Sequence, residues 1–143
     1  MTDSQIKEYL VKTCTPEEAR QLNPLALAFI GDAVYSTFVR RYLIARGDQN
    51  VHRMTRESVR YVRADAQAHS LKAVEDALTP EEQDIVRWGR NTRSTPPKNA
   101  DVMDYRYATA METLLGFLEL TGQQARAFEL TVAFIQAIDC QSE

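Results

Sequence analysis

The sequence predicts an all-α protein that folds as one domain. Apolar residues recur at helical spacing along nearly the whole chain, and no stretch alternates apolar and polar residues for long enough to form a strand. A chain of 143 residues with 44% hydrophobic residues can bury one core and leaves little room for a second folded module. We therefore expect residues 1–143 to form a single helical domain.

The expected helix boundaries follow from caps, prolines and glycines. Two Thr-Pro-Glu-Glu sequences, at 15–18 and 79–82, each place a cap, a proline and acids where a helix begins. Gly47 and Gly122 are typical of residues that follow the end of a helix. After a first helix, we expect a short one following Thr15, longer ones further on, and a loop with two adjacent prolines. The predicted helices cover about 4–12, 25–45, 50–77 (as one helix or two), 79–87, 104–121 and 123–138, and the loop covers 89–101.

Two acids are unusual because each is the only charged residue of an apolar stretch. Asp32 is alone within 24–39, and Glu112 is alone within 107–118. Each has a glycine nearby in its predicted helix, Gly31 and Gly116, although an interior glycine costs about 1 kcal/mol relative to alanine. Such glycines indicate the close approach of another backbone. If the two helices pack together, the acids converge, and a pair of carboxylates suits Mg²⁺.

The apolar surroundings leave several states open for these acids. An unpaired ionised carboxylate inside a protein is strongly unfavourable, so Asp32 is protonated, paired with an arginine, exposed to water in a cleft, or bound to a cation. Arg40, Arg41 and Arg106 are available as ion-pair partners. The pattern of residues does not by itself choose between a structural ion pair and a metal site.

The net charge of −3 conceals two basic regions. Residues 40–63 hold seven arginines against two acids, and residues 85–106 hold five Lys or Arg against two acids. Residues 64–84, in contrast, hold one lysine against six acids. Because binding depends on the local potential, the mild overall acidity does not exclude an anionic partner.

The two basic regions supply candidate contacts for a polyanion. Four arginines spaced by three, four and three residues are predicted to share one helix face: Arg53, Arg56, Arg60 and Arg63. Arginine binds phosphate oxygens through two hydrogen bonds at once. The predicted loop adds a second set: Arg90, Asn91, Arg93, Lys98 and Asn99. A charged helix face can also be merely solvated, with its arginines paired to neighbours such as Glu57 or Asp65.

Other chemistries have little support. His52 and His69 are isolated from each other and from any serine or cysteine arrangement, and no phosphate-binding glycine motif occurs. Cys14 and Cys140 lie at opposite ends without a zinc-binding pattern, which favours a reducing, cytoplasmic location. No apolar run approaches the ~18 residues of a membrane span. We expect a protein that is not associated with a membrane.

Two segments resemble the ribonuclease III family, in the order in which that family carries them. LALAFIGDAVY at 25–35 resembles the family signature, and ATAMETLLGFL at 108–118 resembles its second acidic helix. Together with the polar loop between them, they make the chain similar to the Mini-III branch, a catalytic domain without the double-stranded-RNA-binding module. The resemblance spans about residues 20–138.

The resemblance implies a ribonuclease III-like helical endonuclease domain that forms a homodimer. Such an enzyme uses Mg²⁺ to cleave both strands of double-stranded RNA and leaves 5′-phosphate and 3′-hydroxyl ends; the implied task is the maturation of ribosomal RNA precursors. Asp32 matches the signature aspartate and Glu112 the later catalytic glutamate, so both are expected to hold the metal. The arginine face and the loop are then expected to bind the RNA.

Three positions depart from the family pattern. Full-length ribonuclease III has glutamates where this chain has Leu25 and Ala28, and an aspartate where it has Thr109. Fewer anionic ligands weaken metal affinity, although the Mini-III branch shares the reduced set. Two alternatives therefore stay open: an inactive ribonuclease III-like dimer that binds structured RNA, and an interaction protein whose acids pair with arginines. The sequence does not identify the natural transcript or any ribosomal-protein helper.

Overall fold

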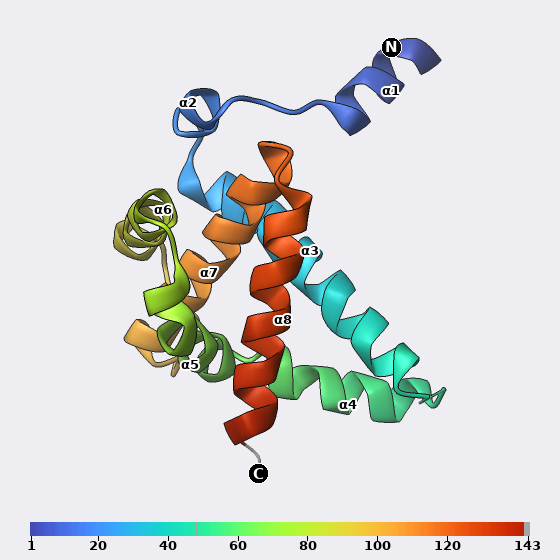
Figure 1. Cartoon of the computed structure of the whole chain (residues 1–143), viewed down its shortest axis with the longest axis vertical. Helices are drawn as coiled ribbons and strands as arrows, with labels where there is room; N and C mark the ends of the chain where they lie inside the picture. The colour runs from blue at the N-terminus through green and yellow to red at the C-terminus, as the bar shows by residue number, and fades with distance from the viewer. Residues whose placement is uncertain (48, 142–143) are drawn as a thin grey trace.

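The computed structural model describes residues 1–47 and 49–141 and confirms the all-α fold (Figure 1). None of the described residues forms a strand, and none of the described helices is long and apolar enough to cross a membrane. The helices, in chain order, are α1 Asp3–Val11, α2 Pro16–Ala19, α3 Pro24–Ala45, α4 Val51–Val62, α5 Ala64–Val74, the 3₁₀ turn η1 Glu75–Ala77, α6 Pro80–Asn91, α7 Val102–Leu120 and α8 Gln124–Gln141.

Helices α3 and α7 make the most extensive contact in the described fold, and two glycines bring their backbones together. A Cβ atom added at Gly31 would lie 1.7 Å from the carbonyl oxygen of Glu112. One added at Gly116 would lie 1.8 Å from the carbonyl oxygen of Leu27. Both distances are far below van der Waals contact, so only glycine permits this approach. The predicted close approach of another backbone at these glycines is therefore confirmed.

Several other helices surround α7. Helices α5 and α6 pack against it, and α8 packs mainly against α5. Helix α6 also approaches α7 closely, because a Cβ at Gly89 would lie 2.7 Å from Oγ1 of Thr113. The four largest fully buried side chains are Tyr35 of α3, Tyr61 of α4, Phe117 of α7 and Phe134 of α8. The core is thus centred on α7, with α3 on one side of it.

Helix α6 is longer than predicted. It continues to Asn91, so Arg90 and Asn91 lie in its last turn and not in the loop where we expected them. The apolar spacing predicted a helix only to about residue 87. Packing of Gly89 against α7 stabilises the helix beyond that point. Residues 92–101 form a loop, as predicted.

The region 50–77 forms two helices and a 3₁₀ turn, and the break falls at Arg63. This residue has an extended backbone, with φ −58° and ψ 146°, between α4 and α5. Helix α5 buries five residues whereas α4 buries only Tyr61, so the break lets α5 enter the core while α4 stays at its edge. Arg63 therefore stands at the C-cap of α4, where the helical face that carries Arg53, Arg56 and Arg60 ends.

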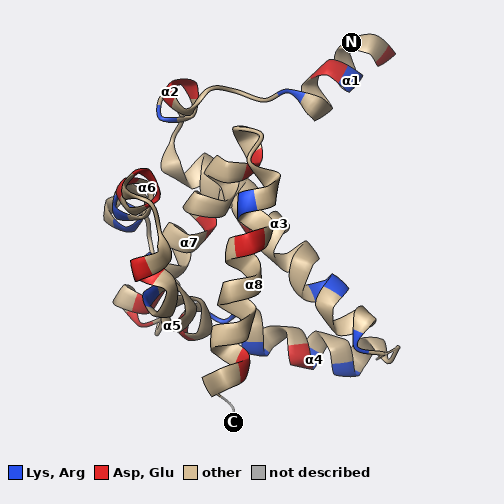
Figure 2. Ribbon diagram, in the orientation of Figure 1, with Lys and Arg blue, Asp and Glu red and all other residues tan. Residues whose placement is uncertain are grey.

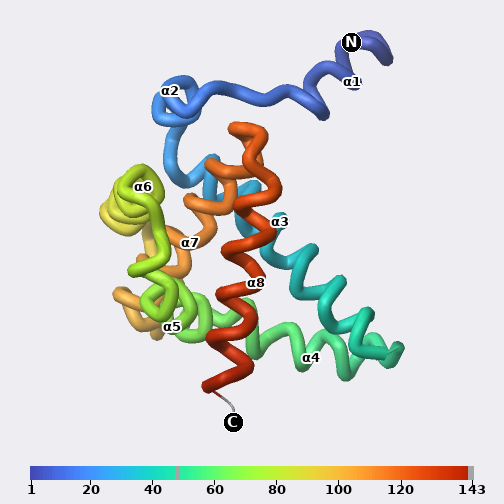
Figure 3. The backbone as a smooth tube through the Cα atoms, in the orientation of Figure 1, coloured from blue at the N-terminus to red at the C-terminus, as the bar shows by residue number. Residues whose placement is uncertain are grey.

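Helix α1 stands away from the other helices, at the end of an extended segment (Figure 3). It buries none of its residues, and Tyr9, for example, is 62% exposed. The chain is fastened to the body after α1, where the backbone N–H of Cys14 donates to the carbonyl oxygen of Leu120 at 2.8 Å. The folded core is therefore built from α2 onwards.

We expect Gly116→Ala to destabilise the protein severely, by ~3 kcal/mol or more, because the new methyl group would overlap the α3 backbone. Gly47→Ala is the matched control: its surroundings are open and only its φ of +97° is unfavourable, so we expect a cost of about 1 kcal/mol. Urea unfolding followed by circular dichroism measures both. Equal losses of unfolding free energy in the two variants would show that α3 and α7 can move apart at Gly116 without losing stability.

Candidate active site

The crossing of α3 and α7 brings Asp32 and Glu112 together. Gly31 lies against the backbone of Glu112, so Asp32, which follows it on α3, sits beside α7. The two acidic side chains lie close enough for Asp32 to influence the pKa of Glu112. Asp32 is exposed to solvent, whereas Glu112 is partly buried. The predicted convergence of the two acids is thus present, with Asp32 at the surface and not enclosed in the core.

Burial raises the pKa of Glu112 to about 9, and the neighbouring Asp32 acts in the same direction. At neutral pH the Glu112 carboxyl therefore keeps its proton. None of the ion pairs between described residues involves either acid, so Arg40, Arg41 and Arg106 do not neutralise them. The structural ion pair that the sequence left open is absent from the described part of the chain.

This donor set fits Mg²⁺. The ion prefers oxygen ligands, commonly takes one or two carboxylates and keeps several waters. A divalent cation would also relieve the repulsion that helps to keep Glu112 protonated. Within residues 1–47 and 49–141, no group of three or more His, Cys, Asp or Glu side chains could hold a metal. The protein thus offers a pair of carboxylates, and the remaining ligands would be water or substrate.

The three departures from the family pattern lie next to this pair. Ala28 is one helical turn before Asp32, Leu25 is two turns before it, and Thr109 is one turn before Glu112. Ala28 and Thr109 are buried, and Oγ1 of Thr109 donates to the carbonyl oxygen of Tyr105 at 3.0 Å. These positions therefore add no negative charge to the site.

Helix α4 carries part of the predicted basic face. Arg53 and Arg56 are exposed, and Figure 2 shows positive residues along α4 and the C-terminal half of α3. Arg60 is partly buried, with Nη1 3.2 Å from Oε2 of Glu57. Arg63 is the C-cap residue of α4, and its Nε is 3.2 Å from Oδ1 of Asp65. The second pair is more exposed than the first, but both are accessible to solvent, so each contributes little to stability and can exchange for another anion.

The second basic set is divided between the end of α6 and the loop. Arg93, Lys98 and Asn99 are exposed in residues 92–101, and Asn99 has a left-handed backbone with φ 69°. Nε of Arg90, in α6, donates to Oδ1 of Asn91 at 3.3 Å. This second basic set therefore combines residues at the end of a helix with residues of a polar loop.

Sequence reasoning missed the aromatic support of Arg90. Its guanidinium lies 6.0 Å from the ring centre of Tyr107 on α7, and Nζ of Lys72 on α5 lies 4.5 Å from the same ring. Cations held over an aromatic face are stabilised by about 0.5–1 kcal/mol at exposed sites. No spacing in the sequence links these three residues, because they come from three different helices.

We expect the melting temperature in EDTA to fall as the pH rises from about 5 to about 9. Glu112 has a pKa near 4.5 when unfolded and about 9 when folded, so the folded state binds the extra proton in this range. Its contribution to stability is complete below the lower value and is lost as the pH approaches the upper one. Glu112→Gln removes the titrating group and should flatten the decline by several degrees. Parallel declines in the two proteins would contradict the raised pKa.

Comparison with known proteins places these features in a family. Residues 25–123 match the ribonuclease III domain. The chain is 48% identical to the Mini-ribonuclease 3 of Thermoanaerobacter sp., over 87% of this chain and 89% of that protein. It is 37% identical to the Mini-ribonuclease 3 of Clostridium tetani, over 96% and 92% of the two chains.

A solved structure supports the same assignment. A protein from Fusobacterium nucleatum superposes with a TM-score of 0.73 and is 26% identical, covering 82% of this chain and 94% of that one. The matched family region contains both acids, both crossing glycines and the polar loop. The chain therefore belongs to the ribonuclease III family and groups with the Mini-ribonuclease 3 proteins within it.

Proposed function

We propose that the chain cleaves double-stranded RNA in a Mg²⁺-dependent reaction at the Asp32–Glu112 pair. As a member of the ribonuclease III family, the chain is an endoribonuclease. The observation that carries the proposal is the pair of neighbouring acids held at a glycine crossing, which no ion pair between described residues neutralises. An acid whose pKa is shifted by burial and by a charged neighbour is a candidate functional group.

Asp32 and Glu112 would hold the metal. Bound Mg²⁺ supplies a nucleophilic water of lowered pKa and stabilises negative charge on the phosphate. Asp32 contributes a carboxylate that faces solvent and is accessible to a large substrate. Glu112 must release its proton to become an anionic ligand, so metal binding should become stronger as the pH rises. The backbone contact of α3 and α7 fixes the spacing of the two side chains.

We propose that the RNA duplex binds across α4 and the end of α6 with its following loop. An A-form duplex is recognised mainly by its shape, 2′-hydroxyls and phosphates, which suits guanidinium and amide side chains. Arg63 remains a candidate because its pair with Asp65 is exposed. The proposed contacts are Arg53, Arg56, Arg60, Arg63, Arg90, Asn91, Arg93, Lys98 and Asn99.

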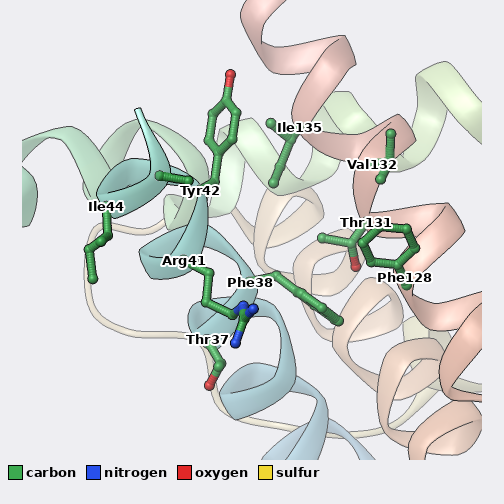
Figure 4. Close-up of a pocket in the computed structure, with 10 residues that line it drawn as sticks. Thr37, Phe38, Arg41, Tyr42, Ile44, Phe128, Thr131, Val132 and Ile135 are labelled. Carbon is green, nitrogen blue, oxygen red and sulfur yellow. The ribbon is translucent and has the colours of Figure 1, made fainter. Parts of the chain in front are cut away.

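We also propose a homodimer, as the ribonuclease III resemblance implies. Phe29 on α3 is 84% exposed and lies one turn before Asp32. A groove of about 850 Å³ between α3 and α8 is lined largely by apolar side chains, including Phe38, Phe128 and Ile135 (Figure 4). A second copy that covers Phe29 and this groove would bury apolar surface that is otherwise in water. It would also bring the two acid pairs into one assembly.

The natural substrate that we propose is a base-paired region of a ribosomal RNA precursor in the cytoplasm. This rests on the family resemblance alone. An inactive RNA-binding dimer is the second candidate function, and the observation that favours it is the restriction of the site to two carboxylates in the described residues.

Asp32→Asn and Glu112→Gln should each preserve the helical fold and slow cleavage by on the order of 100-fold or more, since each removes an anionic metal ligand. Labelled RNA duplex and its separate single strands, incubated with Mg²⁺ or with EDTA, measure this. Glu119→Gln, on the same helix as Glu112, is the matched control and should cut normally. Undiminished Mg²⁺-dependent cleavage by either site variant would remove the proposed site. Duplex binding without cleavage by the unmodified protein would favour the inactive dimer.

Replacing Arg90, Arg93 and Lys98 together by glutamine should weaken duplex binding at least about tenfold and reduce the salt dependence of the affinity. Each lost phosphate contact removes counterion release, so the slope of log Kd against log salt concentration should fall by about one per contact. Lys7→Gln with Lys12→Gln removes charge from the α1 segment and serves as the control. An unchanged slope in the triple variant would exclude these residues as the contact.

Phe29→Asp should convert the dimer to a monomer, because it would bury a charge in the proposed interface. Light scattering after size exclusion measures the mass in solution. Met103→Asp alters another apolar side chain that is 47% exposed and should leave the mass unchanged. A dimer that persists in Phe29→Asp would place the interface elsewhere.

A further inference from the structure

A carboxylate on α8 accepts hydrogen bonds from phenols on two other helices. Tyr42 of α3 and Tyr61 of α4 both donate to Asp139, Tyr61 at 2.6 Å. The two rings also contact each other edge to face, with centroids 5.8 Å apart. Tyr35 of α3 donates to the backbone carbonyl oxygen of Tyr61 at 2.9 Å. These four residues, the tyrosine cluster, connect α3, α4 and α8.

The cluster supplies the fully buried part of the contact between α4 and the rest of the fold, beside the packing of α4 against α3. Tyr61 is the one buried residue of α4, and its side chain is fully buried. Burial raises the pKa of Tyr61 to about 12, and Asp139 adds to the effect through its hydrogen bond and charge. The phenol therefore stays protonated and donates to Asp139 throughout the physiological range. Met54 and Val62 of α4 are only partly buried against the core, so this bond is the main polar contact between α4 and α8 in the described residues.

Two arginines rest on the rings of the cluster. The guanidinium of Arg60 lies 5.4 Å from the ring centre of Tyr61, and that of Arg46 lies 5.2 Å from the ring centre of Tyr42. Contact with an aromatic face restricts the directions available to a long cationic side chain. The position of the rings thus influences where these positive charges lie at the surface.

We propose that Tyr61 and Asp139 are positioning residues for RNA binding. Their hydrogen bond holds α4 against α8, so that Arg53, Arg56 and Arg60 keep one arrangement that can contact several phosphates of a duplex at once. This inference rests on the proposed function, because it requires α4 to contact RNA. A preformed row of charges loses less conformational freedom on binding than a mobile one. A loosened α4 keeps its charge and engages fewer phosphates.

Tyr61→Phe and Asp139→Asn test the inference with little change of shape. The phenylalanine keeps an aromatic ring beneath Arg60 and removes only the hydroxyl, and the asparagine keeps one acceptor oxygen in place of two. We expect each to weaken duplex binding roughly three- to tenfold and to lower the salt slope by about one. Cleavage at saturating duplex should stay within about twofold, since the acids are untouched.

Glu82→Gln separates this effect from general loss of stability. It weakens the ion pair of Glu82 on α6 with Arg126 on α8, 2.8 Å apart, without touching α4. This control should lower the melting temperature and leave the salt slope unchanged. A salt slope lowered equally in Glu82→Gln would overturn the inference, as would unchanged slopes in both Tyr61→Phe and Asp139→Asn.

Arg56→Gln distinguishes failure of this inference from failure of the proposed function. If Arg56→Gln lowers the slope while the two cluster variants do not, α4 contacts RNA without needing the cluster, and only the inference falls. If Arg56→Gln has no effect, or the unmodified protein shows no salt-dependent duplex binding, the RNA surface proposed on α4 is wrong and the inference falls with it.

Discussion

The backbone contact between α3 and α7 is the constraint on which the rest of the structure depends. Gly31 and Gly116 allow carbonyl oxygens of the opposite helices to occupy the space where a side chain would stand. An interior glycine weakens an isolated helix by about 1 kcal/mol, so these helices rely on packing for their stability. The same contact centres the core on α7 and places one acid from each helix at the crossing.

The electrostatics of the acid pair follow from this packing. Because α3 and α7 approach so closely, Glu112 is partly buried and has Asp32 as its neighbour. Because Glu112 keeps its proton at neutral pH, the pair carries less negative charge than two ionised carboxylates would. Two adjacent carboxyl groups are therefore tolerated although no ion pair between described residues involves them, and they are candidates for binding a cation.

The proposed RNA surface has a different structural basis. The rigid crossing holds the acids, whereas the basic residues lie at the periphery, on α4, at the end of α6 and in the following loop. Aromatic rings support two of them: Tyr61 lies beneath Arg60, and Tyr107 beneath Arg90. Peripheral helices held by few buried residues depend on such specific contacts for their orientation.

The sequence by itself determined the helical class, most helix ends, the two isolated acids and the glycines beside them. These features depend on local properties, namely apolar period, capping groups and conformational freedom, which neighbouring residues specify. Only the tertiary structure decided that α4 ends at Arg63, that Arg90 and Asn91 belong to α6, and that Asp139 binds Tyr61 across 78 residues of chain. Each of these depends on which surfaces meet in three dimensions, and packing against α7 or α8 outweighs the weak local preferences of a helix end.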